Sequence, residues 1–131
     1  MRLLFLALLV VCSMQGCAQR CRVVSFDSWS FVDRIVLEVP GEHEKRTIDD
    51  PAVIQKVHAF LMRRTDGWDL PFRDTPLGPL RLDAYQGSKG ITYLAVGEKF
   101  IEAPGCGYAA SRRITAAERR EILSILGVAG T

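Results

Sequence analysis

Histidine is scarce in this sequence, which contains only His43 and His58. Neither residue lies at metal-ligand spacing from the other or from a cysteine, so the pattern of a zinc site is missing. The G-x-S-x-G motif of serine hydrolases is also missing, and residues 87–90 lack the spacing of a P-loop. We therefore expect no metal and no cofactor, and we favour a non-enzymatic function over catalysis.

The sequence also lacks an excess of charge of one sign. It has 17 basic and 15 acidic residues, which give a formal net charge of +2. A domain that binds nucleic acid usually carries a strongly basic patch, so we expect no nucleic-acid partner. About half of the 131 residues are hydrophobic and about a quarter are charged. This composition is typical of a folded chain of one domain and not of a disordered one.

The one marked hydrophobic run is short and lies at the N-terminus. Met1-Arg2 precedes nine apolar residues (3–11), and small or polar residues follow. This is the layout of a secretory signal peptide. A membrane-spanning helix needs about 20 apolar residues, and no segment of the chain reaches that length. The sequence therefore predicts export of the chain.

Residues Met14-Gln15-Gly16-Cys17 resemble the lipobox of bacterial lipoproteins. Gly16 and Cys17 match the lipobox pattern, whereas Met14 and Gln15 depart from the usual Leu and Ala or Ser. The resemblance implies that residues 1–16 are a signal peptide and that Cys17 is acylated. Residues 17–22 would then form a tether, and residues 23–131 a single domain like those of small envelope lipoproteins of unknown function.

Ala18 follows the cysteine of the lipobox-like segment. In Gram-negative lipoproteins a residue other than Asp at this position implies attachment to the periplasmic side of the outer membrane. The alternative is ordinary signal-peptide cleavage after Ala18, which would give a soluble periplasmic or secreted protein. Only in the first case does the lipid attach the protein to a membrane.

Two cysteines remain if the leader is removed and Cys17 is acylated. These are Cys21 and Cys106, and we predict that they form a disulfide, because an exported chain meets an oxidising compartment. The alternative is that Cys21 lies in a flexible tether and both thiols are free. Catalysis by Cys106 with His43 or His58 as a base is a further alternative, and we favour the disulfide over it.

Hydrophobic periodicity predicts five strands and two helices. The first helix begins with Asp50 as its N-cap and Pro51 in its first turn, and the second begins with the capping box Thr115 to Glu118. Gly127 ends the second helix. The predicted strands cover residues 31–39, 45–48, 80–85, 91–96 and 99–103, and a further strand over 23–26 is an open alternative.

The element order ββαβββα predicts a two-layer α+β domain, with an antiparallel sheet and two helices on one face. Its order loosely resembles half of the TATA-binding-protein fold, which carries no implication for function. Three strands between the helices would make the helices parallel. We therefore expect Arg63 and Arg64 to lie at the opposite end of the domain from Arg112 and Arg113.

Several aromatic residues fall in predicted loops. Exposed aromatic side chains concentrate binding energy at interfaces, so we predict partner contacts at Trp29, Trp68, Phe72 and Tyr108. Trp68 is the first choice, because polar and turn-forming residues flank it. The alternative is that these rings cover the ends of the core.

These observations favour a non-enzymatic module that binds an envelope protein, such as an inhibitor or immunity protein. One alternative is a small-ligand-binding or hydrolytic envelope protein that uses a cleft between the loops 65–79 and 104–113. Another is a structural lipoprotein without a specific partner. The sequence leaves the partner and the oligomeric state open.

Overall fold

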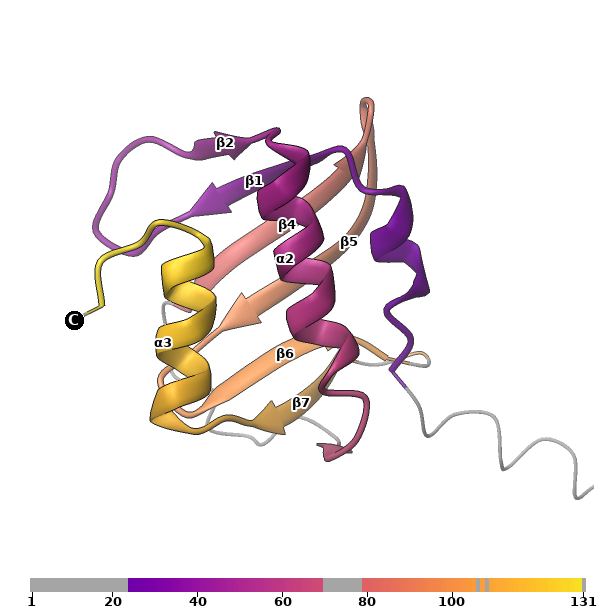
Figure 1. Ribbon diagram of the computed structural model, residues 1–131, viewed down its shortest axis with the longest axis vertical. Helices are drawn as coiled ribbons and strands as arrows, with labels where there is room; N and C mark the ends of the chain where they lie inside the picture. Colours follow the sequence, from indigo (N-terminus) through magenta and orange to yellow (C-terminus); the bar gives the residue numbers. More distant parts are fainter. Residues whose placement is uncertain (1–23, 70–78, 106, 108, 131) are drawn as a thin grey trace, which may run out of the picture.

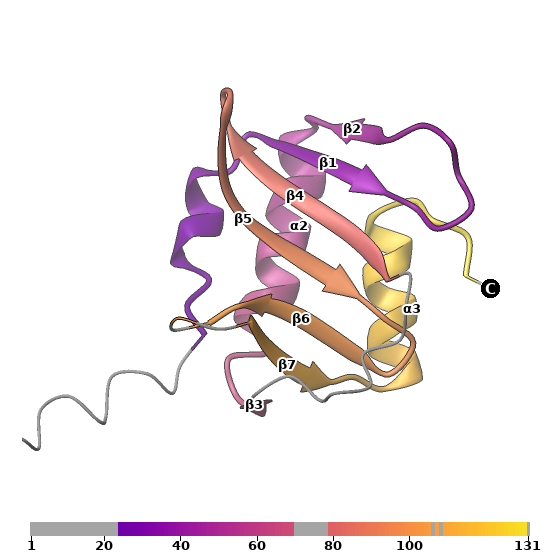
Figure 2. The same cartoon turned by 180° about the vertical axis from the view of Figure 1, so that it is seen from behind.

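The computed structural model describes residues 24–69, 79–105, 107 and 109–130. These residues form two layers, a seven-stranded antiparallel sheet and helices packed on one of its faces (Figures 1 and 2). The predicted α+β class and the placement of both α-helices on one face are therefore confirmed.

The sheet has the strand order β2-β1-β4-β5-β6-β7-β3, and every neighbouring pair is antiparallel. Strands β4 to β7 form a meander. The hairpin of β1 and β2 extends one side of it, and β3 pairs with β7 on the other. The strands are β1 (Arg34–Glu38), β2 (Arg46–Ile48), β3 (Trp68–Asp69), β4 (Leu80–Gln86), β5 (Lys89–Val96), β6 (Phe100–Pro104) and β7 (Ala109–Arg113).

The helical layer consists of α2 (Pro51–Met62), α3 (Ala116–Ile125) and the short 3-10 helix η1 (Asp27–Phe31). The Asp50 side chain accepts a hydrogen bond from the backbone N–H of Ala52 at 2.8 Å, and Thr115 and Glu118 form a reciprocal capping box. Both predicted helix starts are therefore confirmed. Gly127 follows α3 with a positive φ of 66°, the left-handed conformation that ends many helices.

The core lies between the sheet and the two α-helices. Alternate residues of each strand point toward the helices, so β1 contributes Ile35 and Leu37, and β4 contributes Leu82. The helices meet them with buried residues at helical spacing, such as Phe60 in α2 and Ile122 in α3. Each of these five side chains is fully buried.

The sequence prediction missed η1, β3 and β7. The alternative strand over 23–26 is wrong for its described part, because residues 24–26 are irregular and lead into η1. Strand β7 has the sequence Ala-Ala-Ser-Arg-Arg, which shows no aliphatic alternation. It forms because its backbone pairs with β6 at five positions, from Phe100 opposite Arg113 to Pro104 opposite Ala109.

The extra strand β7 reverses the direction of α3. The meander that leads into α3 has four strands, β4 to β7, and not the three that were predicted. As a result, α2 and α3 run antiparallel (Figure 1). The predicted separation of Arg63 and Arg64 from Arg112 and Arg113 is therefore wrong. Arg64 and Arg112 instead contact the same carboxylate, that of Glu118.

Candidate functional site

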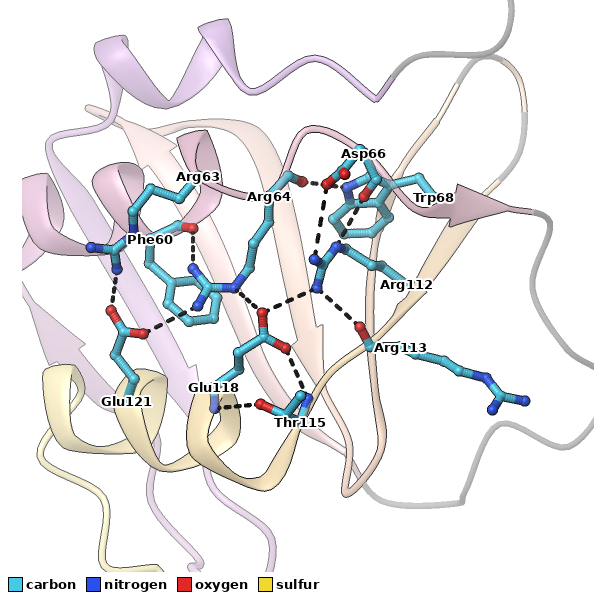
Figure 3. Close-up of polar contacts among 10 residues, drawn as sticks. All are labelled: Phe60, Arg63, Arg64, Asp66, Trp68, Arg112, Arg113, Thr115, Glu118 and Glu121. Carbon is cyan, nitrogen blue, oxygen red and sulfur yellow. Dashed lines mark hydrogen bonds and ion pairs between the residues drawn. The ribbon is translucent and has the colours of Figure 1, made fainter.

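The end of α2 meets the start of α3, β7 and β3 in a polar cluster around Arg64 (Figure 3). Arg64 is only 6% exposed. Its Nη1 donates to the carbonyl oxygen of Phe60 at 2.7 Å, and its guanidinium carbon lies 3.6 Å from the centre of the Phe60 ring. Its Nε donates to Glu118 at 3.0 Å, and its Nη2 donates to Glu121 at 3.1 Å.

Glu118 is shared by three groups in this cluster (Figure 3). Besides Arg64, Nη1 of Arg112 lies 3.4 Å from its carboxylate, and the backbone N–H of Thr115 donates to it at 2.8 Å. The hydrogen bond from Thr115 lowers the pKa of Glu118, with smaller lowering contributions from the charges of Arg112 and Arg64. Burial opposes them by raising it. These groups satisfy one another within the protein, so we interpret the cluster as a structural clamp.

Trp68 also belongs to the clamp. Its indole Nε1 donates to the carbonyl oxygen of Arg64 at 2.6 Å, and its ring packs against Phe26 with centroids 5.5 Å apart. The side chain is only partly exposed. A partner contact at Trp68 stays a prediction, but much of this side chain is engaged in holding β3 to the end of α2.

The structure corrects the expectation for Trp29. This residue is 2% exposed and belongs to the hydrophobic core, where η1 closes one end of the helical layer. It therefore covers one end of the core, which is the alternative that the sequence left open. The 3-10 turn places Phe31 outside instead, where it is 62% exposed.

The remaining predicted site residues lie outside the described part of the chain. These are Cys17, Cys21, Phe72, Cys106 and Tyr108. Lipidation, the disulfide and the two aromatic contacts therefore stay predictions, as does a cleft between the loops 65–79 and 104–113.

The sheet face away from the helices carries a cluster that the sequence prediction missed. Because Leu82 and Ala84 of β4 point toward the core, Arg81, Asp83 and Tyr85 point to the other face. Among the described residues no helix covers this face (Figure 2). We give the name tyrosine face to five of the outward residues of β1, β4 and β5: Arg34, Arg81, Asp83, Tyr85 and Tyr93.

Arginine–aromatic contacts organise the tyrosine face. The guanidinium of Arg34 lies 4.8 Å from the centre of the Tyr85 ring, and that of Arg81 lies 4.9 Å from the centre of the Tyr93 ring. Arg81 also forms an ion pair with Asp83 at 2.9 Å. Partial burial raises the pKa of the Tyr93 phenol, as do the charge and the hydrogen bond of Glu102. The alternation of β4 and β5 in the sequence was a signal that could have revealed this face.

A shallow cleft of about 380 Å³ lies between η1 and the first turns of α2. It was not predicted, because its two walls come from segments about twenty residues apart and one of them is the unpredicted η1. Its lining consists of Trp29, Ser30, Val32, Asp33, Pro51, Ile54, Gln55 and His58.

Comparisons with protein families, curated proteins and solved structures found no match to this chain. Within the described ranges, no group of three or more His, Cys, Asp or Glu residues is placed to hold a metal ion. No helix in the same ranges is long and apolar enough to cross a membrane. Any function must therefore be argued from the N-terminal sequence pattern and from the surfaces described above.

Arg64→Met should destabilise the domain by about 3 kcal/mol, because it leaves Glu118 partly buried without its main ion-pair partner. Arg63→Met is the matched control, since Arg63 is exposed and pairs with Glu121 at the surface. It should cost less than about 1 kcal/mol. Urea unfolding monitored by circular dichroism measures both values. Equal costs for the two variants would contradict the clamp.

Acid should weaken the clamp through Glu118. A carboxylate whose pKa is lowered by folding stabilises the folded state above its ordinary pKa, and this contribution is lost as the pH falls through the lowered value. The free energy of unfolding should therefore fall from about pH 5 to about pH 3, and less so in Glu118→Gln. Glu98→Gln, at an exposed turn position, should keep the wild-type slope. An unchanged slope in Glu118→Gln would show that this carboxylate does not contribute.

Proposed function

We propose that this chain is the precursor of a lipid-anchored protein of the bacterial cell envelope, and that its domain binds another envelope protein there. The lipobox-like Met14-Gln15-Gly16-Cys17 supports this localisation in the cell envelope. After cleavage, Cys17 would hold the domain to the periplasmic side of the outer membrane. The described residues begin at Val24, only seven positions after Cys17 in the sequence, so the tether to the lipid would be short.

The tyrosine face is the observation that supports protein binding. Tyrosine and arginine are enriched where protein interfaces concentrate their binding energy, and here they alternate across neighbouring strands. Asp83 lies opposite Tyr93, and Arg34 lies opposite Tyr85, so each partly exposed ring has a charged neighbour on the adjacent strand. The paired strands hold the backbone of these residues in place, which reduces the entropy lost on binding.

The charges of the tyrosine face indicate the chemistry of its partner. Arg34 and Arg81 carry positive charge, whereas Asp83 and Glu102, which contacts Tyr93, carry negative charge, so neither sign dominates. A strongly charged partner surface would be repelled by part of this face. We therefore propose a partner protein with a mixed polar surface and apolar groups that pack on Tyr85 and Tyr93.

Replacing Cys17 tests the lipid anchor. The wild-type chain should incorporate radiolabelled palmitate and sediment with membranes, whereas Cys17→Ala should do neither, because only a thiol at this position can be acylated. Cys12→Ala, within the predicted leader, is the matched control and should behave as the wild type. A mature wild-type protein that begins with a free Gln19 would instead establish ordinary cleavage after Ala18.

Replacing both tyrosines tests the binding surface. Cross-linking of the full chain in intact cells, followed by its capture, should yield one protein that is lost with Tyr85→Ala/Tyr93→Ala. Met62→Ala is the control, because Met62 is 48% exposed on α2, in the helical layer. It should retain the partner. Circular dichroism confirms that each variant is folded. Retention of the partner by the folded tyrosine variant would contradict binding through this face.

A further inference from the structure

The cleft between η1 and α2 joins an apolar wall to hydrogen-bonding groups. Val32, Pro51 and Ile54 supply the apolar part of the lining, and Asp33 and His58 belong to the same lining. The cleft belongs to the helical layer and is separate from the tyrosine face, so what it binds can be tested independently of the proposed function.

His58 has a buried ring nitrogen without a hydrogen-bond partner. Its Nε2 is shielded from solvent and forms no hydrogen bond with a described group. A buried polar atom left unsatisfied costs about 1–3 kcal/mol. A ligand group that hydrogen-bonds to His58 after a rotation of the ring would offset this cost. The orphaned nitrogen therefore points to a ligand with a hydrogen-bonding group in the cleft.

The charge of the lining is negative. Asp33 is exposed, and its carboxylate accepts only neutral hydrogen bonds from the backbone N–H of Gly87, at 2.9 and 3.1 Å. Among the residues that the structure describes, it forms no ion pair. The positive end of α2 is already occupied, because Asp50 accepts from the N–H of Ala52. The cleft therefore favours a cation over an anion.

We infer that this cleft binds the side chain of an arginine from a protein partner. Its aliphatic part would pack on Val32, Pro51 and Ile54 while its guanidinium donates to Asp33 and His58. A planar guanidinium presents several donors at once and is less strongly hydrated than an ammonium group. These properties suit two acceptors on different walls of a partly apolar cleft.

The chain offers a built-in control for this inference, because His43 is its only other histidine and lies in an exposed turn. The experiment is a titration of the full chain, labelled with ¹⁵N-histidine and purified in detergent, with N-acetylarginine amide. The imidazole signals of His58 should shift and saturate, and those of His43 should stay in place. N-acetylnorleucine amide and N-acetylglutamate amide, which lack the guanidinium, should leave both histidines unchanged.

Two variants connect the binding to the charge of the cleft. Asp33→Asn keeps an oxygen for Gly87 but removes the charge, and it should weaken binding about threefold to fivefold. Gln55→Glu adds a negative charge to the lining at an exposed helical position and should strengthen binding. Glu44→Gln, outside the cleft, should have no effect. Equal shifts of His58 with all three amides, or no shift with the arginine amide, would overturn the inference.

Discussion

The guanidinium of Arg64 carries a full positive charge into a site where the residue is only 6% exposed. Removing a charge from water is expensive unless strong partners replace the lost hydration. Here the carboxylates of Glu118 and Glu121, the carbonyl oxygen of Phe60 and the face of its ring replace it. The packing of α2 against α3 at this end of the helices depends on these protein groups replacing the water around Arg64. The same arginine also anchors β3, because its own carbonyl oxygen accepts the indole N–H of Trp68.

Glu118 connects this ion-pair cluster to the local chemistry of α3. Its carboxylate accepts the backbone N–H of Thr115 in the capping box and also the side chains of Arg64 and Arg112. A residue of the capping box therefore also connects the first turn of α3 to the end of α2 and to β7. A capping box visible in the sequence thus has a tertiary role that the sequence did not indicate.

The parts of the fold predicted from the sequence are those with local chemical causes. Asp50 and the pair Thr115 and Glu118 satisfy free N–H groups within a few residues, and β4 shows a clear alternation of buried and outward residues. Strand β7 depends on pairing with β6, and β3 depends on pairing with β7. A short stretch of sequence does not show which distant segment it pairs with. For this reason these strands and the direction of α3 were not predicted.

The candidate sites were predictable to a smaller extent. The local sequence around an aromatic residue with polar neighbours does not show whether its ring is exposed or buried. Phe31 faces the solvent, whereas Trp29 faces the core. The tyrosine face depends on which side of the sheet the helices cover, and the η1 cleft depends on a turn that brings distant segments together. The sequence carries the residue types of both sites, but their grouping is a property of the fold.

The sheet ends at both sides in very short strands, three residues in β2 and two in β3. An edge strand of ordinary length leaves a row of unpaired backbone groups that can recruit a strand from another molecule. Within the described ranges, each edge strand thus offers an incoming chain only two or three residues to pair with. The domain can thus be crowded at high local concentration with little tendency to polymerise through its backbone, and its associations are left to its side chains.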